Sequence, residues 1–172
     1  MSSFALAAIG RDRPGIVAAV ASVLFEQGCN VEDSSMSLLR GNFAVMLVFT
    51  APDGATADAL ASALAPACDP LGITFSVLEV DDRARTPAPT HVVTVYGSDE
   101  PGILDRVARV IASGGGNITN LSSRLVGDAS PIYVLTIEAE IDDAEALDAR
   151  LHELADDVGV DVSLTPYDTD VI

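Results

Sequence analysis

The sequence of 172 residues is 49% hydrophobic, contains no tryptophan and carries a formal net charge of −17. A chain of this length and apolar content can bury a core, so its composition excludes a disordered chain. The charge argues against direct binding of nucleic acid or anionic membranes by a single copy. Its simplest role is solubility, and an acidic face that docks a basic partner is the alternative.

The N-terminus enters an apolar segment at Phe4 without a basic leader, and no apolar run is long enough to span a bilayer. Cys29 and Cys68 lie far apart and match no metal or redox spacing. We therefore expect a cytoplasmic protein whose two thiols are reduced and buried.

The first predicted elements are a short strand and a helix. Phe4–Ile9 is an apolar strand, and turn residues separate it from segment 16–27, whose apolar side chains recur at helical spacing. Asp12 is the expected N-cap of this helix, with Pro14 in its first turn. Gly28 is the glycine expected to end the helix.

The chain then predicts a hairpin, a second helix and a closing strand. The hairpin segments are rich in strand-forming residues and flank a short turn. The helix is rich in alanine, and we expect it to end near Pro66 or Pro70. The predicted bounds are Val31–Leu39, Phe43–Thr50, Gly54–Ala67 and Ile73–Val80.

The second half of the chain repeats the first at an offset of 87 residues. Gly10-Arg-Asp-Arg-Pro-Gly-Ile16 aligns with Gly97-Ser-Asp-Glu-Pro-Gly-Ile103, and the match continues through Asn30 and Asn117. After Leu38 the offset becomes 89, which predicts two more residues in the second hairpin. The predicted elements are a strand over His91–Tyr96, a helix over Pro101–Ser113, strands over Asn117–Val126 and Ile132–Glu140, a helix over Asp142–Asp156 and a strand over Val160–Tyr167.

Two β-α-β-β-α-β units in tandem predict an α+β fold of two ferredoxin-like units, each an antiparallel sheet with both helices on one face. We expect domains at 1–82 and 91–172, joined at 83–90 by a charged linker that contains two prolines. The other face of each sheet is left open. We expect the alternating residues Thr119, Leu121, Ser123 and Leu125 to lie on it, and this face to pack against another surface. The edge strands are exposed too, so two such units can join edge to edge.

Gly-x-Asp-x-Pro-Gly-Ile after the first strand, with Gly-x-Asn after the helix, occurs in both copies, and in this the chain resembles the ACT-domain family over essentially its whole length. The first copy, through Gly28-Cys-Asn-Val-Glu-Asp-Ser34 and Phe43-Ala-Val-Met-Leu47, is similar to tandem ACT pairs of the type that represses glycine cleavage genes. The resemblance implies a regulator of amino-acid metabolism. Its ligand would lie where the loop after the first strand meets the start of the second strand of a neighbouring unit. Family members often carry a histidine where this chain has Gly10 and Gly97.

The same residues suit an α-amino acid on chemical grounds. The glycines let a ligand approach the backbone, a helix N-terminus favours a carboxylate, and aspartate and asparagine can hold an ammonium group. The competing interpretation is that Asp-x-Pro-Gly is a helix cap and Gly-x-Asn a helix exit. The candidate ligand-binding residues are Gly10, Arg11, Asp12, Arg13, Pro14, Gly15, Ile16, Asn30 and Val31 in the first copy, and Asp99, Pro101, Gly102, Ile103, Asn117 and Ile118 in the second.

The two candidate loops differ in charge. Arg11 and Arg13 of the first copy are replaced by Ser98 and Glu100 in the second. This difference predicts that the loops differ in ligand or affinity, whereas the alternative is a pair of solvated arginines with little energetic effect.

The sequence offers little for catalysis. His91 and His152 fit no triad or metal spacing, and neither a Cys-x-x-Cys pair nor a phosphate loop is present. We expect a non-enzymatic protein without catalytic residues, metal or cofactor that binds a small amino acid, for which the resemblance suggests glycine.

We expect this protein to act through a protein partner, a transcription regulator, and to form a homodimer, without direct contact to nucleic acid or membrane. One alternative is a stand-alone regulatory subunit of an enzyme of amino-acid metabolism. The other is a hydrolase similar to acylphosphatase, whose phosphate loop would use Arg11 and Arg13.

Overall fold

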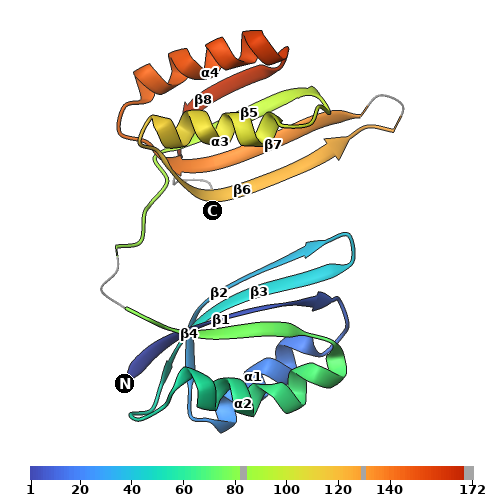
Figure 1. The fold of residues 1–172 in the computed structure, drawn as a ribbon, viewed down its shortest axis with the longest axis vertical. Coiled ribbons are helices and arrows are strands. Elements are labelled where there is room, and N and C mark those ends of the chain that lie inside the picture. Colours follow the sequence, from blue (N-terminus) through green and yellow to red (C-terminus); the bar gives the residue numbers. More distant parts are fainter. Residues whose placement is uncertain (82–84, 129–130, 169–172) are drawn as a thin grey trace. The chain divides into compact units, whose positions relative to one another are not determined.

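The computed structural model describes residues 1–81, 85–128 and 131–168. It divides into two compact units, Met1–Ala84 and Arg85–Ile172 (Figure 1). Each unit follows the order β-α-β-β-α-β and contains one four-stranded antiparallel sheet, which confirms the predicted fold class. The predicted linker at 83–90 and the predicted end of the second domain at 172 lie partly outside the described residues, so these domain boundaries stay predictions.

The first unit has two helices on one face of its sheet (Figure 1). The sheet order is β2-β3-β1-β4, and the short 3₁₀ helix η1 follows α2. The strands are β1 (Ser2–Arg11), β2 (Asn30–Leu39), β3 (Asn42–Ala51) and β4 (Thr74–Val80), and the helices are α1 (Ile16–Glu26), α2 (Ala57–Cys68) and η1 (Asp69–Leu71).

The second unit repeats this arrangement with the sheet order β6-β7-β5-β8. Its strands are β5 (His91–Ser98), β6 (Asn117–Val126), β7 (Ile132–Glu140) and β8 (Asp161–Pro166), and its helices are α3 (Ile103–Ser113) and α4 (Ala144–Val158).

The two hairpins differ in length by more than the sequence predicts. Two residues separate β2 from β3, and five separate β6 from β7, so the second hairpin is longer by three residues and not by two. In the short turn both Arg40 and Gly41 have positive φ, 48° and 76°, as a two-residue hairpin turn requires. The strand register agrees with this count. Ser35 and Ser122 are equivalent in the two copies, but Ser122 pairs with Thr136, which lies three residues further along the chain from it than Met46 lies from Ser35.

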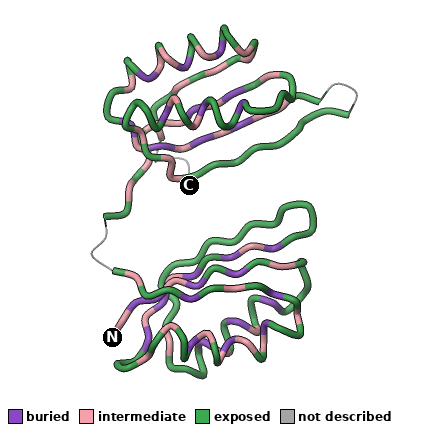
Figure 2. Tube along the Cα trace, viewed as in Figure 1, coloured by how far each residue is buried: buried purple, intermediate pink, exposed green. Residues whose placement is uncertain are grey.

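Each unit buries one core between its sheet and its helices, visible as the purple segments of Figure 2. The helical stripes predicted from the sequence supply one side of it, because residues four apart lie on the same helix face. The buried helix residues are Ile16, Val20, Leu24, Leu60, Leu64 and Cys68 in the first unit, and Ile103, Val107, Ile111, Leu147, Leu151 and Ala155 in the second.

The expectation that Leu121 and Leu125 lie on the open sheet face is wrong. Leu121 lies opposite Ile137 and Leu125 opposite Tyr133, and these partners belong to the helix-side core of the second unit. A β-bulge at Thr119 interrupts the alternation of β6, and a shift of one residue moves every following side chain to the other face.

Helix α2 differs from its predicted bounds at both ends. It begins at Ala57, because the hydroxyl of Thr56 accepts a hydrogen bond from the backbone N–H of Ala59 (3.2 Å) and so caps the helix. It continues past Pro66 and ends at Cys68, before Pro70, so the second of the two predicted ends is correct.

Pro66 weakens α2, and its replacement is expected to stabilise the protein. Proline inside a helix leaves the carbonyl four residues earlier without its N–H donor and crowds it sterically. Pro66 is exposed, so Pro66→Ala costs no packing. After subtraction of the entropy that alanine restores to the unfolded chain, we expect a gain of about 1–2 kcal/mol and a higher Tm in calorimetry.

Pro70→Ala is the matched control for this prediction. Pro70 lies in the first turn of η1, where proline is well tolerated. Its replacement is expected to leave the Tm unchanged or lower it. A Tm that does not rise on Pro66→Ala contradicts the prediction.

Candidate functional site

The candidate loops connect β1 to α1 and β5 to α3, and neither helix is capped by a side chain. Gly15 and Gly102 are the N-cap residues, with φ of 96° and 97°, a conformation that favours glycine. The prediction that Asp12 caps the first helix, with Pro14 in its first turn, is therefore wrong, because α1 begins only at Ile16. The backbone N–H groups at the start of both helices are thus free of side-chain caps.

The carboxylates of Asp12 and Asp99 make no polar contact with the described residues of their own units. In the part of the chain that the structure describes, neither has an ion pair or side-chain hydrogen bond. The backbone N–H of Asp12 donates to the carbonyl of Gly41 (3.0 Å), so the hairpin turn holds this loop in place. Arg11 and Arg13 are exposed, and no acidic partner lies within ion-pair distance of them among the described residues.

The glycines that precede the loops leave no room for a side chain. A Cβ atom at Gly10 would lie 2.6 Å from Cδ1 of Ile73, and one at Gly97 would lie 2.5 Å from Cγ1 of Val160. The residue just before the last strand of each unit therefore occupies the space where the family often places histidine. Any side-chain contact to a ligand in these loops has to come from the residues that follow, Asp12 and Asp99 above all.

The asparagines follow a helix exit that is the same in both units. Gly28 and Gly115 have φ of 72° and 79° and end α1 and α3 as predicted. The backbone N–H of the next residue donates a hydrogen bond to the helix. Cys29 donates to the carbonyl of Leu24 (2.9 Å), and Gly116 donates to the carbonyl of Ile111 (3.0 Å). The exit is thus closed by backbone and glycine alone, without the amides that come after it.

Asn30 and Asn117 begin the edge strands and expose their side chains. Among the residues that the structure describes, neither amide has a side-chain hydrogen bond. Both amides can therefore donate to and accept from a ligand.

The strand register places the loop and the asparagine of one unit at opposite ends of the sheet. Asn30 lies opposite Thr50, which lies opposite Ser3, whereas Gly10 lies opposite Phe43. The two levels are seven residue steps apart along β1, or about 23 Å at about 3.3 Å per residue. One small ligand cannot touch both within a unit, so the structure brings the candidate residues together in two groups per unit.

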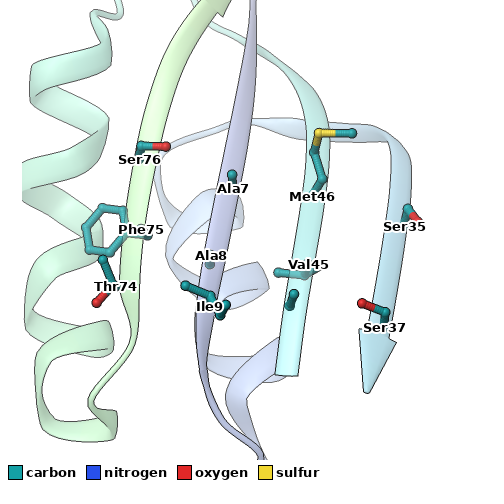
Figure 3. A pocket seen from close by; sticks show the side chains of 11 residues that line it. Ala7, Ala8, Ile9, Ser35, Ser37, Val45, Met46, Thr74, Phe75 and Ser76 are labelled. Atoms are coloured by element: carbon teal, nitrogen blue, oxygen red, sulfur yellow. The ribbon is translucent and has the colours of Figure 1, made fainter. Parts of the chain in front are cut away.

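A groove that the sequence analysis did not predict lies on the open face of the first sheet (Figure 3). It has a volume of about 460 Å³. Its lining consists of small, apolar and hydroxyl side chains, which carry no recognisable motif. The residues that line it are Ala7, Ala8, Ile9, Ser35, Ser37, Ala44, Val45, Met46, Thr74, Phe75 and Ser76.

The cysteines and histidines have ordinary local environments. Cys29 is half-buried and Cys68 is buried, and burial raises the pKa of both thiols. Nδ1 of His91 lies 2.9 Å from the hydroxyl of Thr90, and Nδ1 of His152 lies 2.9 Å from the carbonyl of Asp148.

Within the described ranges, no group of three or more His, Cys, Asp or Glu residues could hold a metal ion. None of the helices in these ranges has the length and hydropathy needed to cross a membrane.

Comparison with known proteins finds the same module in both halves of the chain. A model described as ACT domain matches residues 3–78, and a second model of the same description matches residues 91–156. The glycine cleavage system transcriptional repressor of Escherichia coli is 29% identical over 120 residues, which are 69% of this chain but only 63% of that protein. A UPF0237 protein of Methanopyrus kandleri is 40% identical over 82 residues, 47% of this chain and 91% of that protein.

Two solved structures share the fold over nearly the whole chain. A protein of unknown function from Galdieria sulphuraria aligns with a TM-score of 0.80 and 24% identity, covering 97% of this chain and 99% of that one. A structure assigned provisionally to a glycine cleavage system transcriptional repressor aligns with a TM-score of 0.74 and 18% identity, covering 98% of each chain. At these identities the likeness shows the fold.

Proposed function

The chain belongs to the ACT-domain family as a tandem pair related to the glycine cleavage system transcriptional repressor, and on that premise we propose that it is a non-enzymatic sensor of a small amino acid, glycine foremost. The ligand binds at interfaces between ACT units, and its binding modulates a partner transcription regulator. The protein acts in the cytoplasm as a homodimer.

The separation of loop and asparagine within each unit is the observation that carries this proposal. Leu39 at the end of β2 lies opposite Asn42, which lies opposite Arg11 of β1, so the end of β2 is level with the β1–α1 loop. If β2 pairs antiparallel with the edge strand of another unit, the asparagine at the start of that strand comes level with this loop. All ten residues of β2 are exposed, and an exposed edge strand is a template for such pairing.

The two groups then offer complementary contacts to an amino acid. The uncapped N–H groups at the start of α1 or α3 favour its carboxylate. The carboxylate of Asp12 or Asp99 accepts hydrogen bonds from its ammonium group, and the facing amide of Asn30 or Asn117 serves either. The first loop adds the guanidinium groups of its arginines, so it binds the carboxylate more tightly than the second loop does.

Regulation runs through a protein and not through DNA, because a surface with a net charge of −17 repels the phosphate backbone. A ligand changes partner binding only by its different affinity for two states of the sensor. An interface between units supplies two such states, with and without the bridging ligand.

The test is a thermal-shift screen of the proteinogenic amino acids. A ligand that binds only the folded form adds about 2.7 kcal/mol of stability at a concentration of 100 Kd, so glycine is expected to raise the Tm at millimolar concentration. Asp12→Ala and Asn30→Ala are each expected to weaken binding about 10-fold or more, because each removes a hydrogen bond to a charged group. Asp99→Ala and Asn117→Ala test the second loop in the same way.

Glu79→Ala, which removes an exposed carboxylate from β4, is the charge-matched control and is expected to leave the shift unchanged. Absence of a shift with every amino acid, or an unchanged shift with all four variants, contradicts the proposal. Affinity capture with and without glycine identifies the partner. Recovery of an enzyme of amino-acid metabolism in place of a transcription regulator would assign the chain as a regulatory subunit of that enzyme.

A further inference from the structure

The face of the first sheet that the helices leave open has an apolar centre flanked by hydroxyl groups. In one row across the sheet, Ala7 and Met46 lie between Ser76 and Ser35. In the next row, Ile9 and Ala44 lie between Thr74 and Ser37. Figure 3 shows the hydroxyl residues on the two outer strands, and Ala7, Ile9 and Met46 on the two central strands.

This face is exposed although its centre is apolar. The side chains of Ile9 and Met46 are 56% and 55% exposed, and that of Leu78 further along the face is 63% exposed. The alanines beside them leave the groove of about 460 Å³. A continuous exposed apolar surface that is bordered by polar residues is typical of a protein interface.

The lining of the groove contains no charged residue, in a chain with a net charge of −17. Two copies of such a chain repel each other through most of their surface, so they associate best through a region with little charge. Asp33 of β2 and Arg11 at the end of β1 border this region on the same face, opposite Val48 and Asn42. A basic partner, in contrast, would be recognised by a cluster of acidic residues, and the lining of this groove has none, with Asp33 lying beside it.

The corresponding face of the second unit is different. The register places Thr94 and Tyr96 where the first unit has Ala7 and Ile9, and Thr136 where it has Met46. Glu138 and Arg124 also lie on that face, opposite Asn120 and Val134. The apolar face is thus a property of the first unit and not of the repeated fold.

We propose that the open face of the first sheet is the contact through which two copies of this chain associate about a two-fold axis. An axis parallel to the strands and midway between β1 and β3 sets the apolar strands of one copy on those of the other. It also sets the hydroxyl groups of β2 opposite those of β4, and Asp33 at the rim of the contact, level with Leu78 of the other copy. The face is therefore self-complementary, as a two-fold contact requires.

The size of the face sets the expected affinity. Four strands at about 4.8 Å and about seven residues at about 3.3 Å give roughly 450 Å² per copy, or about 900 Å² for the pair. This total lies close to the roughly 1,000 Å² needed for a specific contact. The dimer is therefore expected to form at micromolar and not at nanomolar concentration.

The test measures the mass of the full chain by analytical ultracentrifugation between about 1 and 200 μM. The mass of the unaltered chain is expected to double over this range. Met46→Glu and Ile9→Glu each place a carboxylate in the contact twice, and each is expected to weaken association at least about 30-fold. Thr136→Glu and Tyr96→Glu add the same charge at the corresponding positions of the second unit and are expected to change it less than about 2-fold.

Circular dichroism of all four variants separates lost association from lost folding. An unaltered chain that keeps its mass over the range overturns the proposal, as does an unchanged doubling in Met46→Glu and Ile9→Glu or an equal loss in both pairs. If the unaltered chain stays monomeric and Met46→Glu lowers its Tm, the face packs against another part of the same chain. The melting shift with amino acids does not depend on this face, so it distinguishes failure of this contact from failure of the sensor proposal.

Discussion

Phe49→Ala is expected to split the thermal unfolding of this protein into two transitions. The Phe49 side chain is fully buried, and its ring stacks on that of Phe4 with centroids 5.9 Å apart. Its removal leaves a cavity, which typically costs about 3–5 kcal/mol. For a unit of this size that loss lowers the Tm by roughly 12 °C or more.

The second transition is expected to stay in place because the two cores share no residue. The core around Phe49 draws only on the first unit, and the core around Leu135 and Ile137 draws only on the second. Differential scanning calorimetry resolves the two. Phe25→Ala is the matched control, since Phe25 is 81% exposed and its loss leaves no cavity. A single transition that moves as a whole on Phe49→Ala contradicts the prediction.

The sequence predicts the fold well because both copies of the repeat carry the same spacing of buried apolar residues. The spacing of Ile103, Val107 and Ile111 reproduces that of the first helix, and all three are buried as predicted. The face of Leu121 could not be predicted, because the bulge at Thr119 leaves no mark in the pattern of an edge strand. The third extra residue of the second hairpin is also evident only from the register, because the sequence alone does not show how the strands pair.

The sequence locates the candidate site only in part. The loops and the asparagines are evident as repeated motifs, but only the register shows that each loop is far from the asparagine of its own unit. The reason for Gly10 and Gly97 is invisible in the sequence, because the atoms that exclude a side chain belong to Ile73 and Val160, more than sixty residues further along the chain. The groove was missed because alanine and serine on a strand are ordinary residues.

Gly97→Ala is expected to destabilise the second unit by about 2–3 kcal/mol, and Gly10→Ala the first by about 1 kcal/mol, although the two glycines are equivalent in the repeat. At Gly10 the closest atom is Cδ1 of Ile73, the far end of a flexible side chain, and the carbonyl oxygen of Gly72 follows at 3.1 Å. At Gly97 the new Cβ would lie 2.5 Å from Cγ1 and 3.0 Å from Cβ of Val160, a short, branched side chain without that freedom.

Val160 cannot retreat through its backbone either. Gly159 before it adopts the left-handed conformation that ends α4, and the N–H of Val160 donates to the carbonyl of Ala155 (3.2 Å). Calorimetry should therefore show the larger fall in the transition of the second unit. In the double variant Gly97→Ala, Val160→Ala the loss is expected to be smaller than the sum of the two single losses, because the shortened side chain removes the closest contact. Strictly additive losses, or a Gly97→Ala chain as stable as Gly10→Ala, would mean that β5 and β8 can separate locally and that the glycine before each loop is not held by the strand beside it.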